Sequence, residues 1–288
     1  MAFEASSGPW PKRIDRGSSS LVVVPVLRNR PDDEVRGFAQ GPGIALGQDG
    51  LVANTLKYLN AQPLIGVNPD PQRWDGKLLP FTVRDLDKVV REVLRQRRSI
   101  KQVTMAKVTL NTGPTLHAVN DFFIGARTHI SARYRIELGK QNENHSSSGV
   151  IVSTGLGSTG WLKSLLTGAA AITQSAGTVL AGQFTQTMFT GKPLQPATPS
   201  KVRLKVKTEF PWDADYLFFT VREPFPTKQT GATLVFGRVT PQQPLTIESQ
   251  MGEAGVIFSD GIEQDFLEFN SGTRATIGIA ERKGVLVV

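Results

Sequence analysis

The sequence predicts two domains, an amino-terminal α/β domain and a carboxy-terminal, mostly-β domain. Three observations support this fold class. The chain has 288 residues, enough for two ordinary domains. Strand-like apolar runs alternate with helical periodicity as far as residue 100, and apolar and polar residues alternate with period two after it. We therefore expect domains at residues 1–100 and 101–288.

The first domain contains a strand–loop–helix–strand unit. Short apolar runs at 21–24 and 44–46 are predicted strands. The loop GQDG at 47–50 leads into a predicted helix at 51–60, and the chain returns as a buried strand at 63–67. The loop glycines therefore fall where the helix begins, a position that suits phosphate binding.

The clearest helix in the sequence spans 82–99. Its apolar residues recur at helical spacing and form one stripe. Thr82 and Asp85 have the spacing of a capping box, and the basic end of the segment suits the negative end of the helix dipole. We expect this helix to close the first domain.

Period-two alternation predicts the strands of the second domain. The predicted strands are 103–110, 122–126, 133–138, 202–207, 216–221, 232–237 and 275–280. One helix is predicted from about Ser158 to Thr173. The segment 182–200 is rich in Gly, Thr, Gln and Pro, so we expect a long loop there.

Composition limits the classes of ligand and chemistry. The net charge is +8, from 33 Lys and Arg against 25 Asp and Glu, which suits a polyanionic ligand. Basic and aromatic residues do not alternate as in nucleic-acid grooves, so the charge favours a phosphate-bearing small molecule over nucleic acid. The absence of cysteine excludes disulfides, thiolate metal sites and cysteine nucleophiles.

Two further features concern location and metals. No apolar run is long enough to cross a bilayer, and the amino terminus lacks the apolar core of a secretory signal. We therefore expect a cytoplasmic protein with no membrane partner. His117, His129 and His145 have no ligand spacing, so we expect no metal site in the protein itself.

Gly155, Gly157 and Gly160 fit the pattern G-x-G-x-x-G and follow a strand-like run, as in a dinucleotide-binding turn. A redox Rossmann unit also needs an acidic residue about 20 positions on, to hold the ribose hydroxyls. No Asp or Glu occurs between Glu143 and Glu209. The glycine loop is therefore weak evidence for a hydride-transfer enzyme.

Taken in order, five segments resemble the NAD kinase family, and most closely its mitochondrial-type branch and the bacterial relatives of that branch. The segments are ALGQDGLVANTLKYL, QPLIGVNPDPQRWDGKLLPF, AVNDFFIGARTHISARYRIEL, SSSGVIVSTGLGSTGW and SDGIEQDFLEFNSGTRATI. Each alone has an ordinary structural explanation, such as a tight turn or a cap. Their order and spacing are specific. The likeness covers roughly 44–165, weakens through 166–245 and returns to the end.

The resemblance implies a two-domain NAD kinase-like fold with the active site between the domains. It also implies transfer of a phosphoryl group from ATP to the 2′-hydroxyl of the adenosine ribose of NAD. By the family pattern Asp49 accepts or orients that hydroxyl proton, and Gly47 and Gly50 shape the phosphate turn. The usual motif is Gly-Gly-Asp-Gly, so Gln48 adds a side chain in the ATP-binding loop.

The resemblance also implies the residues that bind NAD. Asn120 and Asp121 match the family's Asn-Glu pair, which binds the adenosine of NAD. The other matching positions are Ser148, Leu156, Thr159, Gly160 and Trp161. Trp161 replaces a common Tyr and is a candidate to stack on a ring of NAD; the alternative is simple core packing.

The substrates are therefore expected to be NAD and ATP, with Mg²⁺ arriving on ATP and held mainly by its phosphates. We also expect a homodimer or higher homo-oligomer. Two alternatives stay open. One is an NAD(P)-binding protein that has lost kinase activity through Gln48 and a short first domain, since only 22 residues separate Val24 from Gly47. The other is a related sugar or lipid kinase. The choices between ATP and polyphosphate as donor, and between NAD and NADH as acceptor, are open too.

Overall fold

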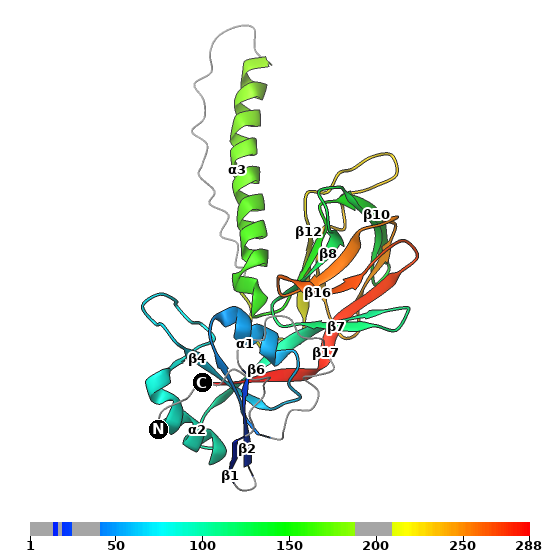
Figure 1. Ribbon diagram of the computed structural model, residues 1–288. Helices are drawn as coiled ribbons and strands as arrows, with labels where there is room; N and C mark the ends of the chain where they lie inside the picture. The colour runs from blue at the N-terminus through cyan, green and yellow to red at the C-terminus, as the bar shows by residue number, and fades with distance from the viewer. Residues whose placement is uncertain (1–13, 17–18, 25–40, 188–208) are drawn as a thin grey trace.

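Two β-sheets and three α-helices make up the part of the chain that the computed structural model describes, residues 14–16, 19–24, 41–187 and 209–288 (Figure 1). The larger sheet has eleven strands and runs from the α/β half into the β-rich half. The smaller sheet has six strands and lies in the β-rich half. The predicted combination of an α/β half with a mostly-β half is confirmed.

Parallel strands form the sheet of the α/β half. They are β2 (Ser19–Val24), β3 (Gly43–Leu46), β4 (Pro63–Asn68) and β5 (Phe81–Thr82), with β1 (Ile14–Arg16) antiparallel to β2 at the edge. These include the three strands predicted here. Parallel neighbours need a crossover connection, and a helix supplies it between β3 and β4.

Helices cover both faces of this parallel region. Helix α1 (Asp49–Leu56) packs with Ala45 on one face, and helix α2 (Leu86–Leu94) packs with Ile44 on the other. Adjacent strand residues point to opposite faces, so Ala45 and Ile44 necessarily serve different clusters. The sheet therefore separates the start of α1 from α2.

Both helices are shorter than the sequence predicts. Helix α1 ends at Leu56 instead of Asn60, because the amides of Tyr58 and Leu59 bond to carbonyls three residues back, at Thr55 and Leu56, in place of the helical pattern. The segment predicted at 82–99 is helical only to Leu94, after a 3₁₀ turn at Val83–Asp85, and Gln96 adopts φ +55°. The positive φ of Gln96 breaks the helical hydrogen-bond pattern, which is why the predicted end at Ser99 was too late.

The predicted capping box is confirmed. The Thr82 amide and hydroxyl both donate to Asp85 Oδ2, at 2.9 and 2.7 Å. These hydrogen bonds lower the pKa of Asp85 below its ordinary value. The Asp85 carboxylate therefore accepts a hydrogen bond from the Thr82 amide, a donor that the first turn of the helix leaves unpaired.

One long strand joins the two halves of the molecule. Strand β17 (Arg274–Val287) pairs antiparallel with β6 (Ile100–Leu110) along most of its length. Its final residues also pair in parallel with β4, where Val285 lies opposite Pro63. The carboxy-terminal part of β17 thus completes the sheet of the α/β half. The boundary at residue 100 stays a prediction.

The β-rich half is a sandwich with one apolar core between its sheets. Beyond β17 the larger sheet continues through β14 (Leu245–Ser249), β9 (Ala132–Leu138) and β10 (Gln141–Ser147), and β7 (Thr115–Ala118) pairs with β6. The smaller sheet has the order β13 (Phe236–Val239), β12 (Leu217–Val221), β11 (Val150–Ser153), β8 (Asp121–Ala126), β15 (Gly255–Ser259), β16 (Ile262–Glu268). Tyr134, Phe122 and Phe219 are fully buried between the two sheets.

Several strand predictions need correction. Seven of the described strands were not predicted: β1, β5, β7, β10, β14, β15 and β16. The predicted strand at 232–237 begins only at Phe236, because Glu143 Oε2 accepts the amides of Thr233 and Leu234 at 3.0 and 2.9 Å. That long-range contact holds the preceding residues in a turn. The predicted strand at 202–207 lies outside the described residues.

Helix α3 (Trp161–Thr187) is much longer than the predicted helix ending at Thr173, and it projects from the body of the molecule (Figure 1). Residues 182–187 were predicted as loop but are helical, and the rest of that predicted loop lies outside the described residues. The segment contains no proline and many good helix formers. Despite its 27 residues, neither α3 nor any other described helix has the apolar length to span a bilayer.

Candidate functional site

Asp49 is the first residue of α1, directly after strand β3 and the N-cap residue Gln48. Its Oδ1 accepts the amide of Leu78 at 2.8 Å, and its Oδ2 accepts the amide of Lys77 at 3.2 Å. A carboxylate in the first turn also interacts favourably with the helix dipole. The Asp49 carboxylate is therefore half-buried and fixed in orientation, and Gly50 beside it is exposed.

The segment GVNPD builds the loop that holds Asp49. The Asn68 side chain donates to the Trp74 carbonyl at 2.9 Å and accepts the Asp70 amide at 3.0 Å. A Cβ at Gly66 would lie 2.0 Å from the Leu78 carbonyl oxygen. Only glycine allows this approach. These contacts shape the loop whose amides bind Asp49.

Asn120 and the glycine loop after β11 form one closely packed unit. The Thr154 amide donates to the Asn120 carbonyl at 2.9 Å, and the Thr154 hydroxyl donates to the Val119 carbonyl at 2.5 Å. The Gly157 amide donates to Thr154 Oγ1 at 3.2 Å. A Cβ at Gly157 would lie 2.1 Å from the Asn120 carbonyl oxygen. Gly157 therefore serves close backbone packing against the segment predicted to bind adenosine.

Asp260, in the turn between β15 and β16, holds the same segment from the other side. Its carboxylate accepts the amides of Val119, Asn120 and Asp121, at 3.1, 2.6 and 3.2 Å. No role was predicted for this aspartate. The signal that pointed to it was the fifth family segment, which begins at Ser259-Asp260-Gly261.

Asp121 is a buried carboxyl with 7% of its surface exposed. Burial, and secondarily the negative charge of Asp260, raise the pKa of Asp121 to about 7. The group therefore changes protonation in the neutral range. A carboxyl that accepts hydrogen bonds from ribose hydroxyls would do so best when ionised.

An apolar cluster joins the segments that carry these residues. Val52 of α1, Leu78, Val119 and Leu156 all belong to it. The start of α1, the loop that holds Asp49, the Asn120 segment and the glycine loop therefore meet in one region. Leu156 is only 6% exposed, so it contributes to this core, and its predicted contact with NAD stays a prediction.

The structure places the remaining predicted residues as follows. Thr159 and Gly160 end the short 3₁₀ turn that follows the glycine loop. Trp161 is half-buried and begins α3, stacked on Phe123 with ring centroids 5.9 Å apart and with Arg222 5.5 Å from its ring. These contacts are packing contacts, and stacking of Trp161 on NAD stays a prediction.

Ser148 lies apart from the glycine loop but near Trp161, because its amide donates to the Arg222 carbonyl at 3.0 Å and the Arg222 guanidinium lies 5.5 Å from the Trp161 ring. Ser148 is exposed and precedes β11, whereas the glycine loop follows that strand. Four strand residues span about 13 Å. Ser148 therefore lies at the opposite end of β11 from Thr154 and Gly157.

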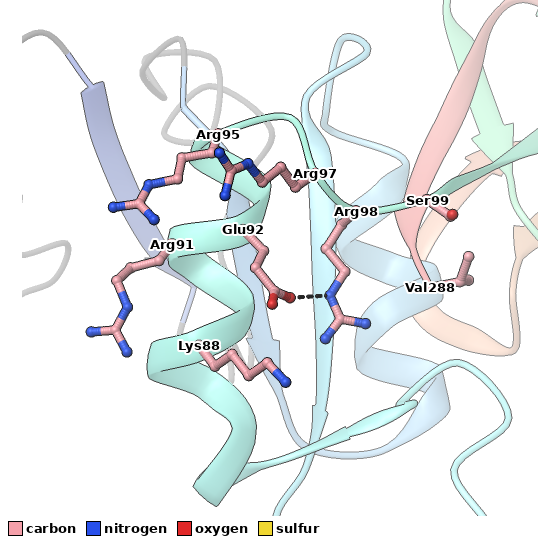
Figure 2. Close-up of a pocket in the computed structure, with 8 residues that line it drawn as sticks. All are labelled: Lys88, Arg91, Glu92, Arg95, Arg97, Arg98, Ser99 and Val288. Atoms are coloured by element: carbon pink, nitrogen blue, oxygen red, sulfur yellow. Dashed lines mark hydrogen bonds and ion pairs between the residues drawn. The ribbon is translucent and has the colours of Figure 1, made fainter.

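A basic pocket of about 410 Å³ lies at the end of α2, where Arg98 pairs with Glu92 (Figure 2). The pocket is lined by Lys88, Arg91, Glu92, Arg95, Arg97, Arg98, Ser99 and Val288. Because α2 and α1 lie on opposite faces of the sheet, this pocket is separate from Asp49. The helix dipole favours cations at the carboxyl end of a helix, so the basic side chains that line this pocket have a structural explanation.

Comparison with known proteins identifies the fold. No protein-family model and no curated protein sequence matches the chain. Yeast NADH kinase in complex with NADH matches with a TM-score of 0.58 and 16% identity over 90% of this chain and 64% of the yeast chain. An NAD kinase from Archaeoglobus fulgidus in complex with ATP matches with a TM-score of 0.55 and 16% identity over 91% of this chain and 82% of that one.

The chain thus has the NAD kinase fold that the sequence predicted. It spans just under two thirds of the yeast chain. The mitochondrial-type branch stays a prediction. Among the described residues, no group of three or more His, Asp and Glu side chains is arranged to hold a metal ion.

Replacing Gly157 with Ala should destabilise the protein by about 1 to 3 kcal/mol, because the new Cβ would overlap the Asn120 carbonyl and force a backbone shift. Urea unfolding measures the change in the free energy of unfolding. Gly252→Ala is the matched control, since no atom lies within 4 Å of a Cβ there. Equal stability of the two variants would contradict the close packing.

Asp121 should make stability depend on pH. Its folded-state pKa of about 7 lies above the ordinary value of 3.8, so the fold favours the protonated form. The stability from this group is fully present below about pH 3.8 and is lost as pH rises from there to about 7, by up to about 4 kcal/mol in total. Unfolding of the parent and of Asp121→Asn, measured between about pH 5 and pH 8, tests this. The variant should lack the decline, and identical profiles would exclude Asp121 as its source.

Proposed function

We propose that this chain is an NAD kinase, which transfers the γ-phosphoryl group of ATP to the 2′-hydroxyl of the adenosine ribose of NAD. The observation that carries the proposal is the placement of Asp49. It begins α1 directly after β3, and two backbone amides fix its carboxylate. The fold supports the same function, because structures with this fold include an NADH complex and an ATP complex.

The reaction needs a group that accepts the proton of the attacking hydroxyl. The ribose 2′-oxygen forms a bond to the γ-phosphorus, the bond to the β–γ bridging oxygen breaks, and ADP leaves. The proton passes to the Asp49 carboxylate. Each carboxylate oxygen binds one amide and keeps a further lone pair for the hydroxyl. Mg²⁺ arrives with ATP, held mainly by the phosphates.

The acceptor side of the proposed site is the unit of Asn120, Asp121 and the glycine loop. Thr154 and Asp260 hold its backbone by hydrogen bonds, so the backbone that carries the Asn120 and Asp121 side chains is rigid. Rigid positioning lowers the entropic cost of orienting a bound ribose. Thr159 and Gly160 lie directly after this unit and are proposed to line the dinucleotide.

The second candidate function, an NAD(P)-binding protein without kinase activity, rests on Gln48. In the structure Gln48 is exposed and extended, with φ −101° and ψ 166°. Any residue adopts this conformation, so the position does not require glycine. The backbone conformation of Gln48 therefore gives no reason for a loss of activity. The cytoplasmic location and the homo-oligomer stay predictions.

The parent protein should form NADP from NAD, ATP and Mg²⁺, and Asp49→Asn should lower kcat about 10²- to 10⁴-fold, the usual scale for a lost proton acceptor. The affinity for NAD should change little. Asp75→Asn is the matched control, because Asp75 is exposed in the loop that binds Asp49. No NADP from the parent would contradict the proposed activity, and parental turnover by Asp49→Asn would contradict the role of Asp49.

Gln48→Gly should change the KM for ATP by no more than about tenfold, or about 1.4 kcal/mol, because the Gln48 side chain already points to solvent. The KM for NAD should stay the same. Steady-state kinetics with each substrate varied in turn measures both constants. If the glycine variant is active while the parent is inactive, the natural protein is a binder.

A further inference from the structure

Lys57 is a buried lysine that the proposed chemistry does not use. It follows the last residue of α1, and only 3% of its side chain is exposed. Its Nζ donates to Ser259 Oγ at 3.1 Å, lies 3.6 Å from Asp260 Oδ2, and forms an ion pair with Asp265. The Lys57 ammonium therefore lies among three polar groups, one each from the end of β15, the turn that follows it and β16.

The second member of this cluster, Asp260, is buried to the same degree, with 2% of its side chain exposed. The carboxylate that faces Lys57 also accepts the three consecutive amides of 119–121. Asp260 adopts φ +54°, an uncommon conformation for a residue other than glycine, so the surrounding contacts must hold it there. Asp260 thus connects Lys57 to the backbone of the Asn120 segment.

Helix α1 relates this cluster to Asp49. Asp49 is its first residue and Lys57 its C-cap, so the two residues stand at opposite ends of an eight-residue helix about 12 Å long. The Lys57 backbone is tied as well, because the Arg282 guanidinium donates to the Lys57 carbonyl at 2.6 Å. A displacement of Asn120 relative to Asp49 would therefore require the Lys57–Asp260 contact to break.

We propose that Lys57 and Asp260 are positioning residues that fix the NAD-binding segment 119–121 relative to Asp49. The expected effect on NAD binding rests on the proposed function, whereas the positioning of segment 119–121 relative to Asp49 does not. Neither residue needs to touch a substrate. A buried ion pair holds its geometry strictly, because either charge left alone in the interior is strongly unfavourable.

The test uses Lys57→Met, Asp260→Asn and the double variant in the full chain. Each single variant should raise the KM and the Kd for NAD at least tenfold and leave the KM for ATP within about twofold. In the double variant the two losses should not add, because both changes break the same Lys57–Asp260 contact. Asp260→Asn is the variant most certain to fold, because Lys57 keeps its ion pair with Asp265. Lys107→Met is the matched control, since Lys107 forms an ion pair with the exposed Glu281.

Amide hydrogen exchange distinguishes failure of this inference from failure of the proposed function. In Asp260→Asn, or in the double variant, the amides of 119–121 should lose protection, while the amides of Lys77 and Leu78 that bind Asp49 keep it. If the parent neither binds NAD nor forms NADP, the proposed function fails, and the exchange pattern still decides the positioning role. Unchanged protection at 119–121, an unchanged NAD constant in folded variants, or equal losses for NAD and ATP would overturn the inference.

Discussion

The contact of the Asp260 carboxylate with three consecutive backbone amides is the interaction on which the candidate site depends. Amides that lie close to a buried carboxylate stabilise its negative charge, and Lys57 supplies the compensating positive charge at 3.6 Å. The arrangement joins the end of α1, in the α/β half, to β8 and the turn after β15, in the β-rich half. The arrangement thereby links the two halves of the candidate site through groups that are not among the proposed NAD and ATP contacts.

Strand β17 provides the second link between the halves. It pairs with β14 in the sandwich and with β4 in the α/β half, while β6 follows it through both. Between Ile279 and Lys283 the register with β6 shifts, and Arg282 in this irregular stretch reaches the Lys57 carbonyl. Bulges commonly redirect a side chain in this way. The backbone connection and the buried ion pair therefore meet at the same end of α1.

Local patterns in the sequence predicted the elements whose cause is local. The capping box of Thr82 and Asp85, the strand–loop–helix–strand unit and the period-two strands are of this kind. Elsewhere, long-range contacts determine elements that local patterns did not predict. Glu143 turns the chain at Thr233, and the polar strand β10 exists because β9 pairs with it. The hydrogen bonds of Lys57 span 202 and 208 residues, so no local pattern marks that lysine as part of the site.

Most contacts that shape the site pair one side chain with backbone atoms. Asp49 binds the amides of Lys77 and Leu78, and Thr154 binds the carbonyls of Val119 and Asn120. Such contacts need a specific residue on one side only, because every non-proline backbone offers the same donor and acceptor. The side chain on the other side can change freely. This is a physical reason why a chain only 16% identical to the matching NADH kinase and NAD kinase structures can have the same fold.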